Sequence, residues 1–348
     1  MSEQYLWDRS GEADAEVRRL EEMLAAFRMP ERPLDLGSVA ETYRERWWQW
    51  PRWSLAAAAC AAVVALAVGI ALLRPRSEAG WAVTALEGTP QIAGKPTLKG
   101  ELRVGQRLQT TGDARARLRV DGIGELEVGG NSELELAERS QHRQRVVLRY
   151  GAIHARVTAP PAVFVVDTPA ARAVDLGCEY SLSVDKEGNG NLVVEAGWVM
   201  LDYEYSQSLV PQGAEAQIRA GGRLTPAYFS DASPTFKALL VQLAIGDDQP
   251  QAARLKALGT LLAEARVRDA YTLINLFRRS TREERLLVYD RLTQLVPAPA
   301  GVAHDAVADG DLRVLSPWWE AVYDALGLRR INKKGGLNLN MYGGLETR

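Results

Sequence analysis

Cysteine and histidine are scarce in this chain of 348 residues, which has two cysteines and three histidines. Cys60 lies inside an uncharged apolar run and Cys178 lies far beyond it, so an intramolecular disulfide is implausible. No histidine stands near another one, and no cysteine joins them at the spacing of metal ligands, which predicts no metal site. His154 in particular lies in a strand-like stretch, where we expect an ordinary surface or core histidine.

The chain also lacks the short motifs that carry catalysis in many enzymes. It has no GxSxG, no P-loop and no GxGxxG after a strand. We therefore predict no catalytic residue, no cofactor and no enzyme activity. The formal net charge is only −2 and no segment is strongly polarised, so direct binding to nucleic acid is not expected. With 47% hydrophobic and 25% charged residues, the chain is predicted to form two or three folded units.

One long stretch has no charge at all: SLAAAACAAVVALAVGIALL, residues 54–73. As a helix it would reach about 30 Å, roughly the hydrocarbon thickness of a bilayer, which predicts one transmembrane helix. A secretory signal peptide is the alternative, but it would start near the N-terminus and be shorter. The side chains predicted to lie at the membrane interface are Trp47, Trp48, Trp50, Arg52, Trp53 and Arg74.

Before this run, residues 1–53 are predicted to form a short helical segment. From Asp14 to Arg28 the apolar residues fall at spacings of three and four, as on one face of a helix. Ser38 followed by Glu41 is a capping box that predicts a second helix. Two interpretations stay open: the helices pack on each other or on the membrane, or they dock another protein. The candidate docking residues are Tyr5, Leu6, Trp7, Val17, Leu20, Leu24 and Phe27.

After the run, residues 80–230 alternate apolar and polar side chains with a period of two. Leu118 and Val120 alternate with Arg117 and Arg119, and glutamates alternate with apolar residues in the next stretches. Turn signals such as Asp-Gly and Gly-Gly separate the stretches. This pattern predicts an all-β sandwich or roll with one buried face and one solvated face, on which arginine and glutamate pair across strands.

Four stretches of this region resemble the FecR domain family: GTPQIAGKPTLKGELRVGQRLQTTGDARARLRVDGIGELEVGGNSELEL, VVLRYGAIHARV, FVVDTPAARAVDLGCEYSLSV and NLVVEAGWVML. The chain departs from the family pattern at Ile123-Gly124 and at Cys178 to Tyr180, and both departures look structural. The resemblance implies a cytoplasmic N-terminal segment that binds a sigma factor, one span and a periplasmic FecR domain. Founding members end in a small α/β module, whereas this chain predicts helices over residues 234–328 and a flexible tail at 329–348.

The predicted fold class is therefore multi-domain: a short cytoplasmic α-helical segment, one transmembrane helix, an all-β FecR-like sandwich or roll and a C-terminal α-helical region. The favoured function is a FecR-like signal transducer or sigma-factor regulator in the bacterial inner membrane. It would link an extracytoplasmic β domain to a cytoplasmic partner. The alternative is a membrane-anchored periplasmic structural or envelope-binding module without sigma-factor control. The expected partners are a sigma factor, an extracytoplasmic protein or envelope ligand, and membrane lipid.

Overall fold

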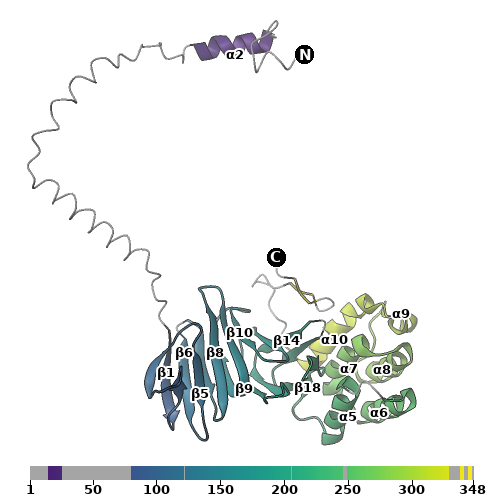
Figure 1. Ribbon diagram of the computed structural model, residues 1–348. Coiled ribbons are helices and arrows are strands. Elements are labelled where there is room, and N and C mark those ends of the chain that lie inside the picture. Colours follow the sequence, from purple (N-terminus) through teal and green to yellow (C-terminus); the bar gives the residue numbers. More distant parts are fainter. Residues whose placement is uncertain are drawn as a thin grey trace, which may run out of the picture. The chain divides into compact units, whose positions relative to one another are not determined.

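The computed structural model describes residues 15–25, 80–120, 122–204, 206–245, 249–328, 338–340 and 344–346 (Figure 1). The chain divides into two compact units, Met1–Arg76 and Ser77–Arg348. The described part of the first unit is the helix α2 (Ala15–Ala25). Glu16 lies in its first turn, where a negative charge interacts favourably with the helix dipole.

In the second unit, strands β1 to β18 form one 18-stranded sheet. The strands of its first half are β1 (Trp81–Glu87), β2 (Gln91–Ile92), β3 (Lys95–Pro96), β4 (Lys99–Leu102), β5 (Arg107–Thr110), β6 (Arg115–Val120), β7 (Gly124–Val128), β8 (Ser132–Arg139) and β9 (Gln144–Val157). They are followed by β10 (Phe164–Asp167), β11 (Arg172–Asp175), β12 (Glu179–Val184), β13 (Gly190–Ala196), β14 (Trp198–Tyr203), β15 (Ser206–Pro211), β16 (Ala214–Arg219), β17 (Arg223–Leu224) and β18 (Tyr228–Phe229). A separate pair, β19 (Asn338–Asn340) and β20 (Gly344–Glu346), follows near the C-terminus.

The alternating pattern of the strands decides which side chains are buried. In β6, Leu118 is fully buried and Val120 is 5% exposed, whereas Arg117 and Arg119 lie on the outer face. The neighbouring β7 is antiparallel, and its register sets Arg117 opposite Glu127 and Arg119 opposite Glu125. The cross-strand pairing of arginine with glutamate predicted from the sequence is therefore confirmed for these two strands.

The long strand β9 bends in the middle and connects two parts of the sheet. Its first half pairs with β8 and β10, and its second half pairs with β7 and β12. Gly151 lies at the bend with a φ of +104°, and a Cβ there would lie 2.0 Å from Ser132 Oγ. Only glycine therefore fits this position without moving the backbone. Because the chain returns to the start of β9 after the bend, β10 runs parallel to β9.

The last part of the second unit is helical. Its α-helices are α5 (Pro234–Ile245), α6 (Gln251–Glu264), α7 (Ala270–Leu276), α8 (Arg282–Leu295), α9 (His304–Ala308) and α10 (Ser316–Leu326), with 3₁₀ turns η1 (Val267–Asp269), η2 (Phe277–Arg279) and η3 (Leu312–Leu315). A capping box begins α8: Thr281 Oγ1 accepts from the Glu284 N–H, and Glu284 Oε2 accepts from the Thr281 N–H at 2.8 Å.

The helices pack against the end of the sheet near β14 and β18 (Figure 1). Trp198 of β14 contacts the rings of Tyr271 from α7 and Tyr323 from α10, with centroids 6.3 and 5.9 Å away. The hydroxyl of Tyr271 donates to the Leu209 carbonyl of β15 at 2.8 Å. Trp319 adds an edge-on contact to Tyr271 at 5.7 Å. Strands and helices therefore share one hydrophobic core.

The predicted fold class, which combined one transmembrane helix with an all-β sandwich or roll, is wrong. Across the described ranges, no helix is long and apolar enough to cross a membrane. The helices α6 and α8 have 14 residues each, which gives about 21 Å against the roughly 30 Å of a bilayer core. The strands form a large mixed sheet with a parallel pair, because β9 bends at Gly151. The apolar run at 54–73 lies outside the described residues.

Candidate functional site

The predicted docking residues that the structure describes lie on α2. Leu20 and Leu24 are four residues apart, on one face of the helix, and their exposed fractions are 53% and 61%. Met23, three residues after Leu20, is 58% exposed and extends the same face, although the sequence pattern did not include it. Val17 also belongs to α2. We call Leu20, Met23 and Leu24 the α2 stripe.

The other predicted site residues are not described by the structure. The candidate docking residues Tyr5, Leu6, Trp7 and Phe27 lie outside the described residues. The same holds for the predicted membrane-interface residues Trp47, Trp48, Trp50, Arg52, Trp53 and Arg74. Their roles, and the inner-membrane location implied by the apolar run and the FecR resemblance, stay predictions.

On the outer face of the sheet, charged side chains form a network across β6, β7, β9 and β12. Arg117 pairs with Glu127 at 2.7 Å and Arg119 with Glu125 at 3.1 Å. One strand pair further on, Arg156 lies 2.6 Å from Glu179. These pairs are solvent-exposed, so each contributes little to folding. The network matters more for binding than for folding, because its charges decide which charged ligands this face can bind.

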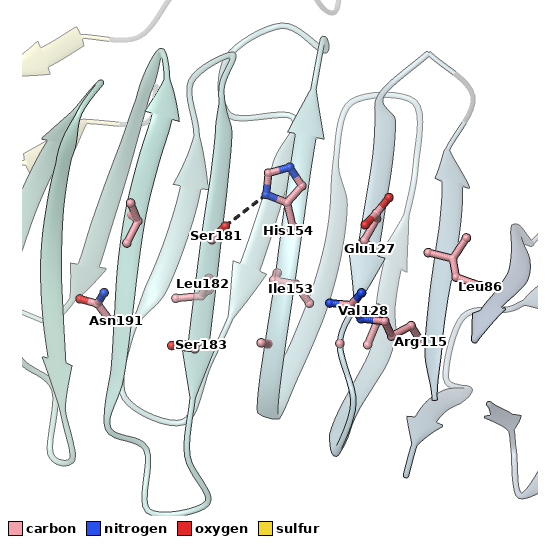
Figure 2. Close-up of a pocket in the computed structure, with 13 residues that line it drawn as sticks. Leu86, Arg115, Glu127, Val128, Ile153, His154, Ser181, Leu182, Ser183 and Asn191 are labelled. Atoms are coloured by element: carbon pink, nitrogen blue, oxygen red, sulfur yellow. Dashed lines mark hydrogen bonds between the residues drawn. The ribbon is translucent and has the colours of Figure 1, made fainter. Parts of the chain in front are cut away.

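His154 of β9 lies at the centre of the polar part of this face. Its Nδ1 is 3.1 Å from Ser181 Oγ on β12, and its Nε2 is 3.2 Å from Glu179 Oε1. Ser181 in turn donates to Glu195 Oε1 on β13 at 3.0 Å. His154 and Ser181 line a shallow hollow of about 230 Å³ on this face, and Figure 2 shows the two side chains next to each other. The sequence could not show this cluster, because it depends on the register of three strands.

This cluster has the residue types of a hydrolytic Ser-His-Glu triad but not the surroundings of one. Stabilising a tetrahedral intermediate needs backbone N–H groups that point at the developing oxyanion. Ser181 lies inside β12, which pairs with β9 on one side and β13 on the other. The N–H groups beside Ser181 therefore belong to the sheet ladders. The arrangement is suited to binding a proton or a cation.

A second polar pair, Asp175 and Cys178, is buried at the end of β11. The Cys178 thiol donates to Asp175 Oδ2, and the Gly177 N–H donates to Oδ1 at 2.7 Å. Burial raises the pKa of Asp175 to about 6. Burial, followed by the nearby Asp175 charge, also raises the pKa of Cys178. Cys178 is 4% exposed, as expected for a small buried thiol, and it is un-ionised at neutral pH.

Asp175 should make the stability of the second unit depend on pH. Its pKa is about 6 in the folded protein against 3.8 ordinarily, so the folded state binds this proton more tightly. The resulting stabilisation is complete below 3.8 and is lost as the pH rises through about 6. Asp175→Asn removes this dependence. In urea unfolding, the stability of the variant relative to the wild type should increase by about 3 kcal/mol between pH 3.5 and pH 7.

Asp185→Asn is the matched control for this prediction. Asp185 is exposed, and the hydrogen bond from the Asn189 side chain lowers its pKa. A lowered pKa contributes stability at neutral pH that is lost on acidification, so this variant should change relative stability in the opposite direction. Equal pH profiles for Asp175→Asn and the wild type would mean that Asp175 titrates normally.

Comparison with known proteins identifies one region of the chain. The family model described as FecR protein matches residues 106–200, which run from the start of β5 into β14. This match confirms the resemblance drawn from the four sequence stretches. No curated protein matches the chain.

Two crystal structures of a candidate anti-sigma factor from Parabacteroides distasonis are similar to the chain, each with 15% sequence identity and a TM-score of 0.31. The first similarity covers 39% of this chain and 64% of the other chain, and the second covers 44% and 73%. This chain therefore spans just under two thirds of the first of these structures.

Proposed function

Because residues 106–200 form a FecR domain, we propose that the chain is a regulator of a sigma factor that relays a signal from this domain. In this proposal the sigma factor binds the first unit and the signal is received by the second. The family match is the observation that carries the proposal, since FecR proteins relay signals to sigma factors. The two roles agree with the division of the chain into two compact units.

The α2 stripe supports the first half of this proposal. Three large apolar side chains are more than half exposed on a helix of 11 residues. Exposed apolar residues at spacings of three and four are the anchors by which an amphipathic helix binds a groove on a partner. The stripe is flanked by both signs of charge, Arg18, Arg19, Glu21 and Glu22. These charges can orient the helix in the groove, whereas the apolar side chains provide the affinity.

The outer face of the FecR domain supports the second half. Its side chains are polar, both charge signs alternate along it, and His154 lies in the hollow between the strands. Such a face suits recognition of a polar or charged ligand. No bond-making step is required of a protein that only binds, receives and relays. The predicted absence of enzyme activity is consistent with this function and stays a prediction.

A capture experiment tests the proposed function. The full-length chain is immobilised, and each sigma factor encoded in the genome of its source bacterium is passed over it separately. We expect one specialised sigma factor to be retained and to lose transcription activity with its core polymerase when the chain is added. The housekeeping sigma factor is the control and should pass through. Passage of all sigma factors without retention would refute the proposal.

A further inference from the structure

We propose that His154, Glu179 and Glu195 form a binding site for a divalent cation of the zinc class on the outer face of the FecR domain. The three residues come from the neighbouring strands β9, β12 and β13, and one ligand atom from each lies within 4.8 Å of the others. Imidazole nitrogen and carboxylate oxygen are ordinary zinc ligands at 2.0–2.2 Å. The site is independent of whether the chain regulates a sigma factor.

The three side chains lie close enough together to bind one tetrahedral ion once one carboxylate has rotated. Ligands about 2.05 Å from a tetrahedral ion lie about 3.3 Å from one another. His154 Nε2 lies 3.2 Å from Glu179 Oε1, and His154 Nδ1 lies 3.6 Å from Glu195 Oε1. One imidazole binds a metal through one nitrogen, so either carboxylate must rotate toward the nitrogen that is used. The side chains of Glu179 and Glu195 are 27% and 45% exposed and have room to do this.

A β-bulge places Glu195 beside the other two ligands. The register between β12 and β13 shifts so that Glu179 pairs with Ala196 and Tyr180 pairs with Val194. Glu195 is therefore an extra residue without a direct partner in the ladder. Bulges of this kind redirect a side chain and often lie next to functional sites. Here the bulge brings a second carboxylate to the imidazole, and Ser181 Oγ holds that carboxylate at 3.0 Å.

The charges around the cluster favour a cation. The two carboxylates carry two negative charges, and the neighbouring Arg156 supplies one positive charge. Arg156 Nε and Nη2 both donate to the same oxygen, Glu179 Oε1, at 3.1 and 2.6 Å. The arginine therefore competes with a metal for Glu179, and it holds the pKa of that carboxyl low. A divalent cation would satisfy the charge that Arg156 leaves uncompensated.

Titration of the full-length chain with Zn²⁺ after removal of metal by EDTA tests this site, with calorimetry as the readout. The wild type should bind at this site, and His154→Gln and Glu195→Gln should each weaken that binding by about tenfold or more, since even residues that only support metal ligands contribute 10–100-fold. Arg156→Gln should do the opposite and tighten binding, because it frees Glu179.

The matched control is His304→Gln. His304 also lies near two carboxylates, Asp290 at 3.7 Å and Asp305 at 3.4 Å, but these residues belong to the helical region. This variant should bind Zn²⁺ as the wild type does. Circular dichroism confirms that each variant is folded, and Co²⁺ used in place of Zn²⁺ gives a visible spectrum that should disappear in His154→Gln. Unchanged Zn²⁺ affinity in His154→Gln, or loss of binding in His304→Gln, would overturn the proposal.

Discussion

Replacing Leu20 by glutamate is expected to weaken capture of the sigma factor by at least thirtyfold. Leu20 belongs to the α2 stripe, and its side chain is 53% exposed before a partner binds. A buried apolar anchor at the centre of an interface contributes about 2 kcal/mol or more to binding. A glutamate at this position would in addition need to lose its hydration without gaining a partner. Binding of the purified full-length chain to the captured sigma factor measures the effect.

Arg19→Glu is the control for this change. Arg19 neighbours Leu20 but lies off the stripe, so reversing its charge should change the affinity by less than about fivefold. Neither substitution should alter the thermal unfolding of the second unit, because residues 77–348 form a separate compact unit. Equal capture by Leu20→Glu and the wild type would show that the stripe is not the docking surface. An envelope-binding module without sigma-factor control would then explain the chain better.

Tyr271→Ala is expected to destabilise the second unit by about 3–5 kcal/mol, the usual cost of removing a large buried aromatic side chain. Tyr271 is 1% exposed and contacts Trp198 of the sheet as well as Trp319 and Tyr323 of α10. The substitution therefore leaves a cavity at the junction of sheet and helices. Urea unfolding should show a lower midpoint, and fluorescence and circular dichroism should still report a single transition.

Tyr271→Phe separates packing from hydrogen bonding at this junction. It keeps the ring and removes only the hydroxyl, which donates to the Leu209 carbonyl at 2.8 Å. The expected loss is about 1–2 kcal/mol, because a buried carbonyl loses one hydrogen bond. A Tyr271→Ala variant as stable as the wild type, or helices that unfold in a transition of their own, would contradict a shared core.

Local patterns in the sequence predicted the parts of the fold that depend on neighbouring residues. The alternation in residues 115–128 predicted that Arg117 and Arg119 face solvent and pair with glutamate, and the register confirms this. The start of α8 is a local feature of the same kind, since the capping box of Thr281 and Glu284 involves four consecutive positions. The motifs of the FecR resemblance can also be read from the sequence alone. The family match confirms the resemblance over residues 106–200.

The features that the sequence did not predict depend on long-range geometry. His154, Glu179 and Glu195 meet only because β9, β12 and β13 are adjacent and β13 carries a bulge. The parallel pairing of β10 follows from the bend of β9 at Gly151, which no alternation pattern reveals. The packing of the helices on Trp198 also required the tertiary structure.

Hydrogen exchange of the full-length chain with and without its sigma factor tests the central claim most directly. Amide protons of a helix exchange more slowly when a partner covers it and stabilises its hydrogen bonds. If α2 is the docking element, exchange over Ala15–Ala25 should slow markedly in the complex and stay fast in the Leu20→Glu variant mixed with the same sigma factor. Unchanged exchange over Ala15–Ala25 in a complex that does form, with protection confined to the strands of residues 81–229, would contradict the claim.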